Sequence, residues 1–138
     1  MLLNIAEANE RAAAMAAIRA EVQGGRAGTR VSRILVQPMR RGLGEVLVGF
    51  RRDPQVGPLV MLAAGGVLTE IYRDRALRLA PVTLEAAREM VGEVRALQAL
   101  AGFRGQAKGD LEAVAGAVVA VSRLAVLDDA NVLEAEIN

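Results

Sequence analysis

The last residues of the chain combine carboxylate and amide side chains at a spacing that suits a metal ion. Glu134, Glu136 and Asn138 alternate with the apolar residues Ala135 and Ile137. Because side chains at positions i and i+2 of a β-strand lie on one face, these polar side chains are predicted to point the same way. Oxygen ligands suit Mg²⁺, which commonly takes one or two protein groups together with phosphate oxygens and water. The alternative interpretation is an edge strand with one polar face.

The remaining residue types restrict what chemistry the chain supplies. It has no histidine and no cysteine, and Lys108 is its single lysine. An imidazole base, a histidine metal ligand, a phosphohistidine and thiolate chemistry are therefore excluded for this chain. Nucleotide-binding proteins commonly place a lysine on the phosphates. If this chain binds ATP, we expect it to supply only part of the site.

Composition and charge indicate a single globular domain. The chain has 138 residues, of which 53% are hydrophobic and 24% charged, and its formal net charge is +1. This balance predicts a real core and gives no general attraction to nucleic acid or to an anionic membrane. Neither a long apolar run nor a signal peptide is present in the sequence, so we expect a cytoplasmic protein without a membrane partner.

Apolar periodicity predicts the elements that must position the polar residues. Helical spacing predicts a helix over 7–23, with Gly24 and Gly25 as its stop. Short apolar or alternating runs predict strands over 2–6, 30–38, 45–51, 59–63, 67–72 and 76–79. Pro38 would end the second of these strands, since proline lacks the backbone donor of a sheet ladder.

Two further helices are predicted in the second half of the chain. Thr83 and Asp110 are the expected N-caps, each followed by an acidic residue in the first turn and an apolar stripe. The stripe after Thr83 continues to Leu97, and the chain then closes with the polar strand at 134–138. Strands interleaved with helices in this order predict an α+β fold with a mainly antiparallel sheet.

Three groups of residues, taken in order, resemble a known family. They are Val36-Gln37-Pro38-Met39 followed by Gly44 to Gly49, then Asp53 to Pro58 leading to Gly65 to Glu70, and last Glu134 to Asn138. Over nearly the whole chain, from about Leu3, the sequence resembles the ATP-grasp domain of NDP-forming acyl-CoA synthetases, relatives of the succinyl-CoA synthetase β subunit. The resemblance implies an ATP-grasp-like subdomain, with ATP or ADP and Mg²⁺ as ligands. It assigns the metal to Glu136 and Asn138.

The resemblance also implies an adenine pocket. Val36, Gln37, Pro38 and Met39 would border the purine through backbone groups and the apolar Met39 side chain. The alternative is a strand that ends at a proline beside a core methionine. Glu45 would bind the ribose or help to coordinate the metal, or else it is a solvated strand carboxylate.

The remaining implied site residues lie around a glycine loop. Gly65 and Gly66, with Glu70, resemble the family's strand–loop–strand near the nucleotide, where glycines let backbone N–H groups approach an anion. An ordinary hairpin turn is the alternative. Arg78 would contact a phosphate or a carboxylate substrate, or else it pairs with Asp74.

The implied function is that of a fragment. Residues 1–138 would form a partial ATP-grasp domain that lacks the upstream phosphate-binding lysine and histidine-bearing segment and the residues after the terminal strand. The parent enzyme would couple acyl-CoA thioester formation or cleavage to ATP/ADP interconversion, through a phosphorylated histidine. Its partners would be the nucleotide and the rest of the synthetase, with CoA-binding and ligase domains or subunits. The chain alone is expected to be inactive.

Two other interpretations remain open. The same fold could serve as a non-catalytic interaction or regulatory module, such as the synthetase-like part of an acetyltransferase fusion, or the likeness could be coincidental. A divided domain would also leave an apolar face exposed, through which the chain could form a homo-oligomer. The sequence does not identify the acyl substrate or choose between ADP and GDP.

Overall fold

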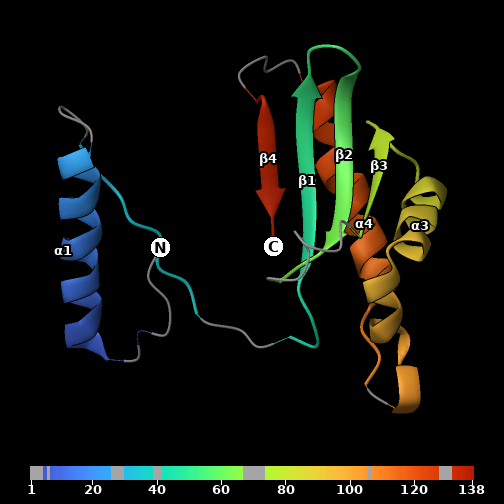
Figure 1. Cartoon of the computed structure of the whole chain (residues 1–138). Coiled ribbons are helices and arrows are strands. Elements are labelled where there is room, and N and C mark those ends of the chain that lie inside the picture. Colours follow the sequence, from blue (N-terminus) through green and yellow to red (C-terminus); the bar gives the residue numbers. More distant parts are fainter. Residues whose placement is uncertain are drawn as a thin grey trace. The chain divides into compact units, whose positions relative to one another are not determined.

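The computed structural model describes residues 5, 7–25, 30–38, 42–66, 74–105, 107–127 and 132–138. The chain divides into two units, residues 1–41 and residues 42–138. In the first unit, helix α1 (Ala8–Gly25) confirms the helix predicted from the sequence, and it has no buried residue (Figure 1). The predicted stop at Gly24 and Gly25 is wrong, because both glycines belong to the helix. Within the described ranges, no helix is long and apolar enough to cross a lipid bilayer.

The strand predicted over 30–38 is wrong. These residues have no regular secondary structure. A strand exists only where a neighbouring strand completes its ladder hydrogen bonds, and the described strands pair only with one another. The apolar run of Ile34, Leu35 and Val36 therefore did not suffice to define a strand. The strand predicted over 67–72, and nearly all of that over 2–6, lies outside the described residues.

Among its described residues, the second unit contains a four-stranded antiparallel sheet. Its strands are β1 (Val46–Asp53), β2 (Gly57–Ala64), β3 (Arg75–Leu79) and β4 (Glu134–Ile137). They lie in the order β3-β2-β1-β4, so β4, the last described strand along the chain, pairs with β1, the first (Figure 1). With the helices, this sheet confirms the predicted α+β class.

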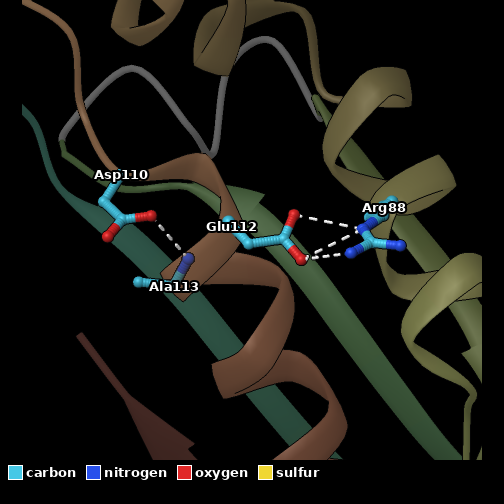
Figure 2. Close-up of polar contacts among 4 residues, drawn as sticks. All are labelled: Arg88, Asp110, Glu112 and Ala113. Atoms are coloured by element: carbon cyan, nitrogen blue, oxygen red, sulfur yellow. Dashed lines mark hydrogen bonds and ion pairs between the residues drawn. The ribbon is translucent and has the colours of Figure 1, made fainter.

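Both predicted N-caps are confirmed. The Thr83 hydroxyl accepts a hydrogen bond from the Ala86 N–H at 3.2 Å and begins α3 (Leu84–Glu93). The Asp110 carboxylate accepts from the Ala113 N–H at 2.8 Å and begins α4 (Leu111–Ser122) (Figure 2). Side-chain acceptors at these positions satisfy amide groups that have no partner inside the helix.

Helix α3 ends at Glu93, before the end of the apolar stripe that was predicted to continue to Leu97. Asp74 accepts the backbone N–H groups of Arg95 at 3.0 Å and Ala96 at 2.7 Å, just beyond the helix. The chain continues as the 3₁₀ helix η1 (Arg95–Ala101), which keeps Leu97 buried. After it come η2 (Phe103–Gly105) and, following α4, η3 (Arg123–Val126).

Helices α3 and α4 are joined at their surface by an ion pair. The Arg88 Nε donates to both Glu112 carboxylate oxygens at 3.1 Å (Figure 2). The hydrogen bond from Arg88 holds the pKa of the Glu112 carboxyl below its usual value. Since both side chains are exposed, the pair contributes little to stability.

One face of the sheet carries the core. The buried residues come from alternate positions of the strands and from the facing sides of α3, η1 and α4; they include Val48, Val60, Leu62, Ala76, Met90, Val94, Leu97 and Val118. The strand registers place a second set of residues on the opposite side. This side is called the open face and comprises Leu47, Gly49, Arg51, Leu59, Met61, Leu77, Leu79, Glu134 and Glu136.

Candidate functional site

Strand β4 places Glu136, one of the two predicted metal ligands, on the open face, and Asn138 directly follows the strand. Glu136 pairs in register with Gly49 of β1, whose neighbour in β2 is Met61. The Asn138 amide donates a hydrogen bond to Glu136 Oε1 at 3.4 Å. The prediction that these two side chains point the same way is therefore confirmed. Their role as metal ligands stays a prediction.

The open face combines apolar surface with these oxygen groups. Met61 and Leu47 are half-buried there, while Leu77 of edge strand β3 is 43% exposed and Leu79 is 62% exposed. The leucine and methionine side chains provide an apolar surface, and Glu136 lies in strand β4 at one edge of the sheet. Apolar lining with a few placed polar groups is typical of small-molecule sites.

The donor set fits a metal ion that shares its coordination with a ligand. Among the described residues, no group of three or more His, Cys, Asp or Glu side chains could hold a metal. Glu136 and Asn138 provide one carboxylate and one amide oxygen. Mg²⁺ rarely needs a full protein cage, because it takes its other ligands from water and substrate phosphates. The residues present therefore suit a nucleotide-bound cation better than a structural one.

Glu45 and the two glycines predicted from the sequence lie together. The Gly65 N–H donates to the Glu45 carbonyl at 2.7 Å. A Cβ at Gly65 would lie 2.5 Å from the Glu45 Cβ, so only glycine permits this approach. Gly66 has a φ of +90°, and a Cβ there would lie 3.8 Å from Glu45 Oε2. The glycines thus fit the backbone around Glu45, a structural role that was not predicted from the sequence.

Arg78 lies on the other face. It pairs in register with the core residue Val60, and its guanidinium donates to Glu93 of α3 at 3.1 Å and to the Leu77 carbonyl at 2.9 Å. The alternative prediction, that Arg78 pairs with Asp74, is wrong, because the Asp74 carboxylate accepts the backbone N–H groups of η1 instead. A role for Arg78 in binding phosphate stays a prediction, and its position opposite to Glu136 gives it no support.

The predicted adenine edge belongs to the first unit. Val36 is 57% exposed, and Gln37 and Pro38 are exposed as well. Met39 and Glu70 lie outside the described residues. The contribution of these residues to a nucleotide pocket therefore stays a prediction.

Sequence reasoning overlooked Arg52. It occupies the next position after Val46, Val48 and Phe50 on the helix-covered face of β1, and its guanidinium carbon lies 5.7 Å from the centroid of the Phe50 ring. Its Nε donates to the Val132 carbonyl at 3.2 Å. The sequence contained a signal for this role, because Arg52 continues the alternating apolar positions of β1. A charged side chain on a buried face needs hydrogen-bond partners.

Comparison with known proteins decides the family. The ATP-grasp domain model matches residues 1–138, the whole of the sequence. This chain belongs to the ATP-grasp domain family. The family membership predicted from the sequence is thereby confirmed, and with it the ATP-grasp-like character of the fold.

Several relatives of this ATP-grasp chain are acid–CoA ligases. It is 41% identical over 136 residues to the acetate–CoA ligase [ADP-forming] I of Archaeoglobus fulgidus, covering 99% of this chain and 20% of that protein. It is 46% identical over 94 residues to the acetate–CoA ligase [ADP-forming] I subunit beta of Pyrococcus furiosus, covering 68% of this chain and 40% of the subunit. The chain therefore spans less than half the length of either relative.

A solved structure with a similar fold contains bound ligands. The acetyl-coenzyme A synthetase 1 of Ca. Korarchaeum cryptofilum, in complex with coenzyme A, Ca-AMPCP and HgCl⁺, matches with a TM-score of 0.80 and 34% identity. The match covers 99% of this chain and 59% of that one. A second structure of that enzyme contains Mg-AMPPCP and a phosphohistidine segment that points towards the nucleotide-binding site, at a TM-score of 0.66, 37% identity and a coverage of 72% and 46%.

Proposed function

We propose that this chain is part of an ATP-grasp nucleotide site in an ADP-forming acid–CoA ligase. In this proposal residues 1–138 are a partial domain. The whole enzyme couples formation or cleavage of an acyl-CoA thioester to interconversion of ATP and ADP, and the rest of the ligase supplies the CoA and acyl sites. The likeness to ADP-forming acetate–CoA ligases over 99% of the chain supports this assignment.

The observation that carries the proposal is the position of Glu136 and Asn138. Both lie at the edge of an apolar sheet face, and the Asn138 amide is within hydrogen-bond distance of the Glu136 carboxylate. A nucleotide carries a flat aromatic base and charged phosphates, which the ribose joins. The open face offers a matching surface, with Leu47 and Met61 for the base and oxygen ligands for a phosphate-bound Mg²⁺.

The residues of this chain then have defined tasks. Glu136 and Asn138 bind and orient the cation, which supplies charge neutralisation on the phosphates when it is bound. Glu45, whose backbone carbonyl accepts the Gly65 N–H just before β1, would accept a ribose hydroxyl or contribute to the cation. A border of the adenine formed by Val36 to Met39 stays a prediction from the resemblance.

The phosphoryl-accepting histidine belongs to another part of the ligase in this proposal. The chain contains no histidine. It therefore acts by holding the nucleotide while a histidine-bearing segment elsewhere exchanges the phosphoryl group. The predicted cytoplasmic location and the predicted self-association through an apolar face stay predictions.

Metal-dependent nucleotide binding tests the proposal. In the full-length protein that contains this sequence, ADP affinity is measured with and without Mg²⁺ by calorimetry for the parent, Glu136→Gln and Asn138→Ala. We expect both variants to lose most of the Mg²⁺-dependent gain in affinity. Glu112→Gln, which alters an exposed carboxylate between α3 and α4, is the matched control and should bind as the parent does. Unchanged Mg²⁺ dependence in both site variants would refute the metal assignment, and a parent without nucleotide binding would favour the non-catalytic interaction module.

A further inference from the structure

Strand β4 is weakly anchored by its own residues. It has only four residues, pairs with β1 alone among the described strands, and none of its side chains is fully buried. A short edge strand of this kind gains little from apolar burial. Because the candidate ligands Glu136 and Asn138 lie at its end, something else must fix the position of this strand.

The Arg52 guanidinium bridges the two segments that lead into β4. Its Nη2 donates to the carbonyls of Leu124 at 3.1 Å and Leu127 at 3.3 Å, at the end of η3. The Ala125 carbonyl is a further acceptor at 3.4 Å. On the other side, Nε donates to the Val132 carbonyl at 3.2 Å, directly before the strand.

The Arg52 backbone continues the same connection. Its N–H donates to the Leu133 carbonyl at 2.8 Å, so side chain and main chain of one residue contact two successive carbonyls before β4. Only the planar guanidinium presents several fixed donors in one fork. A lysine ammonium has the charge but not this geometry, and an apolar side chain would leave the carbonyls without these donors.

We propose that Arg52 is the positioning residue of the candidate metal site, because it fixes the entry into β4 and thereby the Glu136–Asn138 pair. The part of this inference that concerns the metal rests on the proposed function. The part that concerns β4 does not, so the two are tested separately.

Amide hydrogen exchange tests the anchoring of β4 in the 138-residue chain. We compare the parent with Arg52→Met and Arg52→Lys, and use Arg123→Met, an exposed arginine of η3, as the matched control. In Arg52→Met, exchange in β4 should rise severalfold more than exchange at Val60 and Leu62 of the core. Arg52→Lys should recover only part of the protection, and Arg123→Met should resemble the parent. An equal rise in β4 and core, or no rise in β4, would overturn the inference.

Metal binding tests the consequence for the site. Mn²⁺ affinity in the presence of ADP is measured by electron paramagnetic resonance on the full-length protein. We expect Arg52→Met to weaken Mn²⁺ by about tenfold, the lower end of what loss of a group that orients a metal ligand costs. In a Glu136→Gln background the same change should have almost no further effect, since the site is already impaired.

The outcomes separate the two proposals. If Glu136→Gln leaves Mn²⁺ affinity unchanged, the proposed metal site fails, while the exchange data still decide whether Arg52 anchors β4. If Glu136→Gln weakens Mn²⁺ and a folded Arg52→Met does not, the positioning role fails and the metal site stands. Equal weakening by Arg52→Met in both backgrounds would indicate a general loss of stability and would also overturn the inference.

Discussion

Gly65 illustrates how a single missing side chain shapes the candidate site. Its backbone lies against that of Glu45, and its N–H is hydrogen-bonded to the Glu45 carbonyl. The sequence predicted a glycine loop here from its possible approach to an anion. The close approach that the structure contains is to the protein's own backbone, which depends on a partner twenty residues away and is not encoded in the local motif.

Gly65→Ala should therefore destabilise the second unit. The added Cβ would lie 2.5 Å from the Glu45 Cβ and 2.8 Å from its carbonyl carbon, so one of the two backbones must shift. Overpacking of this kind costs about 1–3 kcal/mol, which urea unfolding measures. Gly92→Ala in α3 is the matched control, because a Cβ there meets nothing within 4 Å. A Gly65→Ala variant as stable as the parent would contradict the fit described for this loop.

Asp53 should titrate below its ordinary range. Its Oδ1 accepts the N–H groups of Gln55 at 2.9 Å and Val56 at 3.1 Å in the turn between β1 and β2. These hydrogen bonds lower the pKa of the Asp53 carboxyl. A lowered pKa in the folded state means that its contribution to stability is complete above the unfolded pKa and is lost as the pH falls through the folded pKa.

Carbon-detected NMR of the Asp53 carboxyl measures this titration. Asp53→Asn keeps an acceptor oxygen but cannot titrate, so its stability should lose that part of the acid dependence. An Asp53 that titrates at or above the ordinary aspartate value would contradict the hydrogen-bonded turn.

At the scale of elements, features that depend on neighbouring residues were predicted correctly, and features that depend on residues far along the chain were not. The N-caps Thr83 and Asp110 need only the next few residues, and the face shared by Glu136 and Asn138 follows from the two-residue period of a strand. To form a strand, the segment 30–38 would need a pairing strand. The Arg78 side chain binds Glu93, 15 residues away, and the Arg52 side chain binds the Val132 carbonyl, 80 residues away. No pattern within a short window contains those partners.

The cap of α4 offers a test at this scale. Asp110→Ala should lower the free energy of unfolding by about 1 kcal/mol, since the Ala113 N–H loses its acceptor. Asp110→Asn retains a capping oxygen and should stay close to the parent. Thermal and urea unfolding followed by circular dichroism provide the measurement, and equal stability of Asp110→Ala and the parent would contradict the cap.

At the scale of the whole molecule, the chain contains one wall of the proposed site. It has no histidine and a single lysine, and it spans 20% of the Archaeoglobus ligase. A surface that contacts a nucleotide from one side leaves the phosphates in water, where charge interactions are weak. The binding free energy is therefore expected to depend on groups supplied by the rest of the ligase.

The 138-residue chain alone should consequently bind ATP weakly or not at all, with or without Mg²⁺. The full-length protein that contains it should bind ATP more tightly, and calorimetry on both proteins measures the difference. A circular dichroism spectrum of the short chain serves as the control for folding. Equal affinity of the two proteins would show that residues 1–138 form a complete site and would contradict this prediction.

The strand order β3-β2-β1-β4 also has a consequence for how the chain is made. A ribosome releases β1, β2, β3 and both packing helices before β4, which pairs with residues 83 to 89 positions earlier in the sequence. Domains begin to fold during synthesis, so the core forms while β1 still has an unpaired edge. Strand β4, which contains Glu136 and directly precedes Asn138, is therefore the last described strand to join the sheet, and a nascent chain that stalls before it leaves the edge of β1 unpaired, where another chain can add.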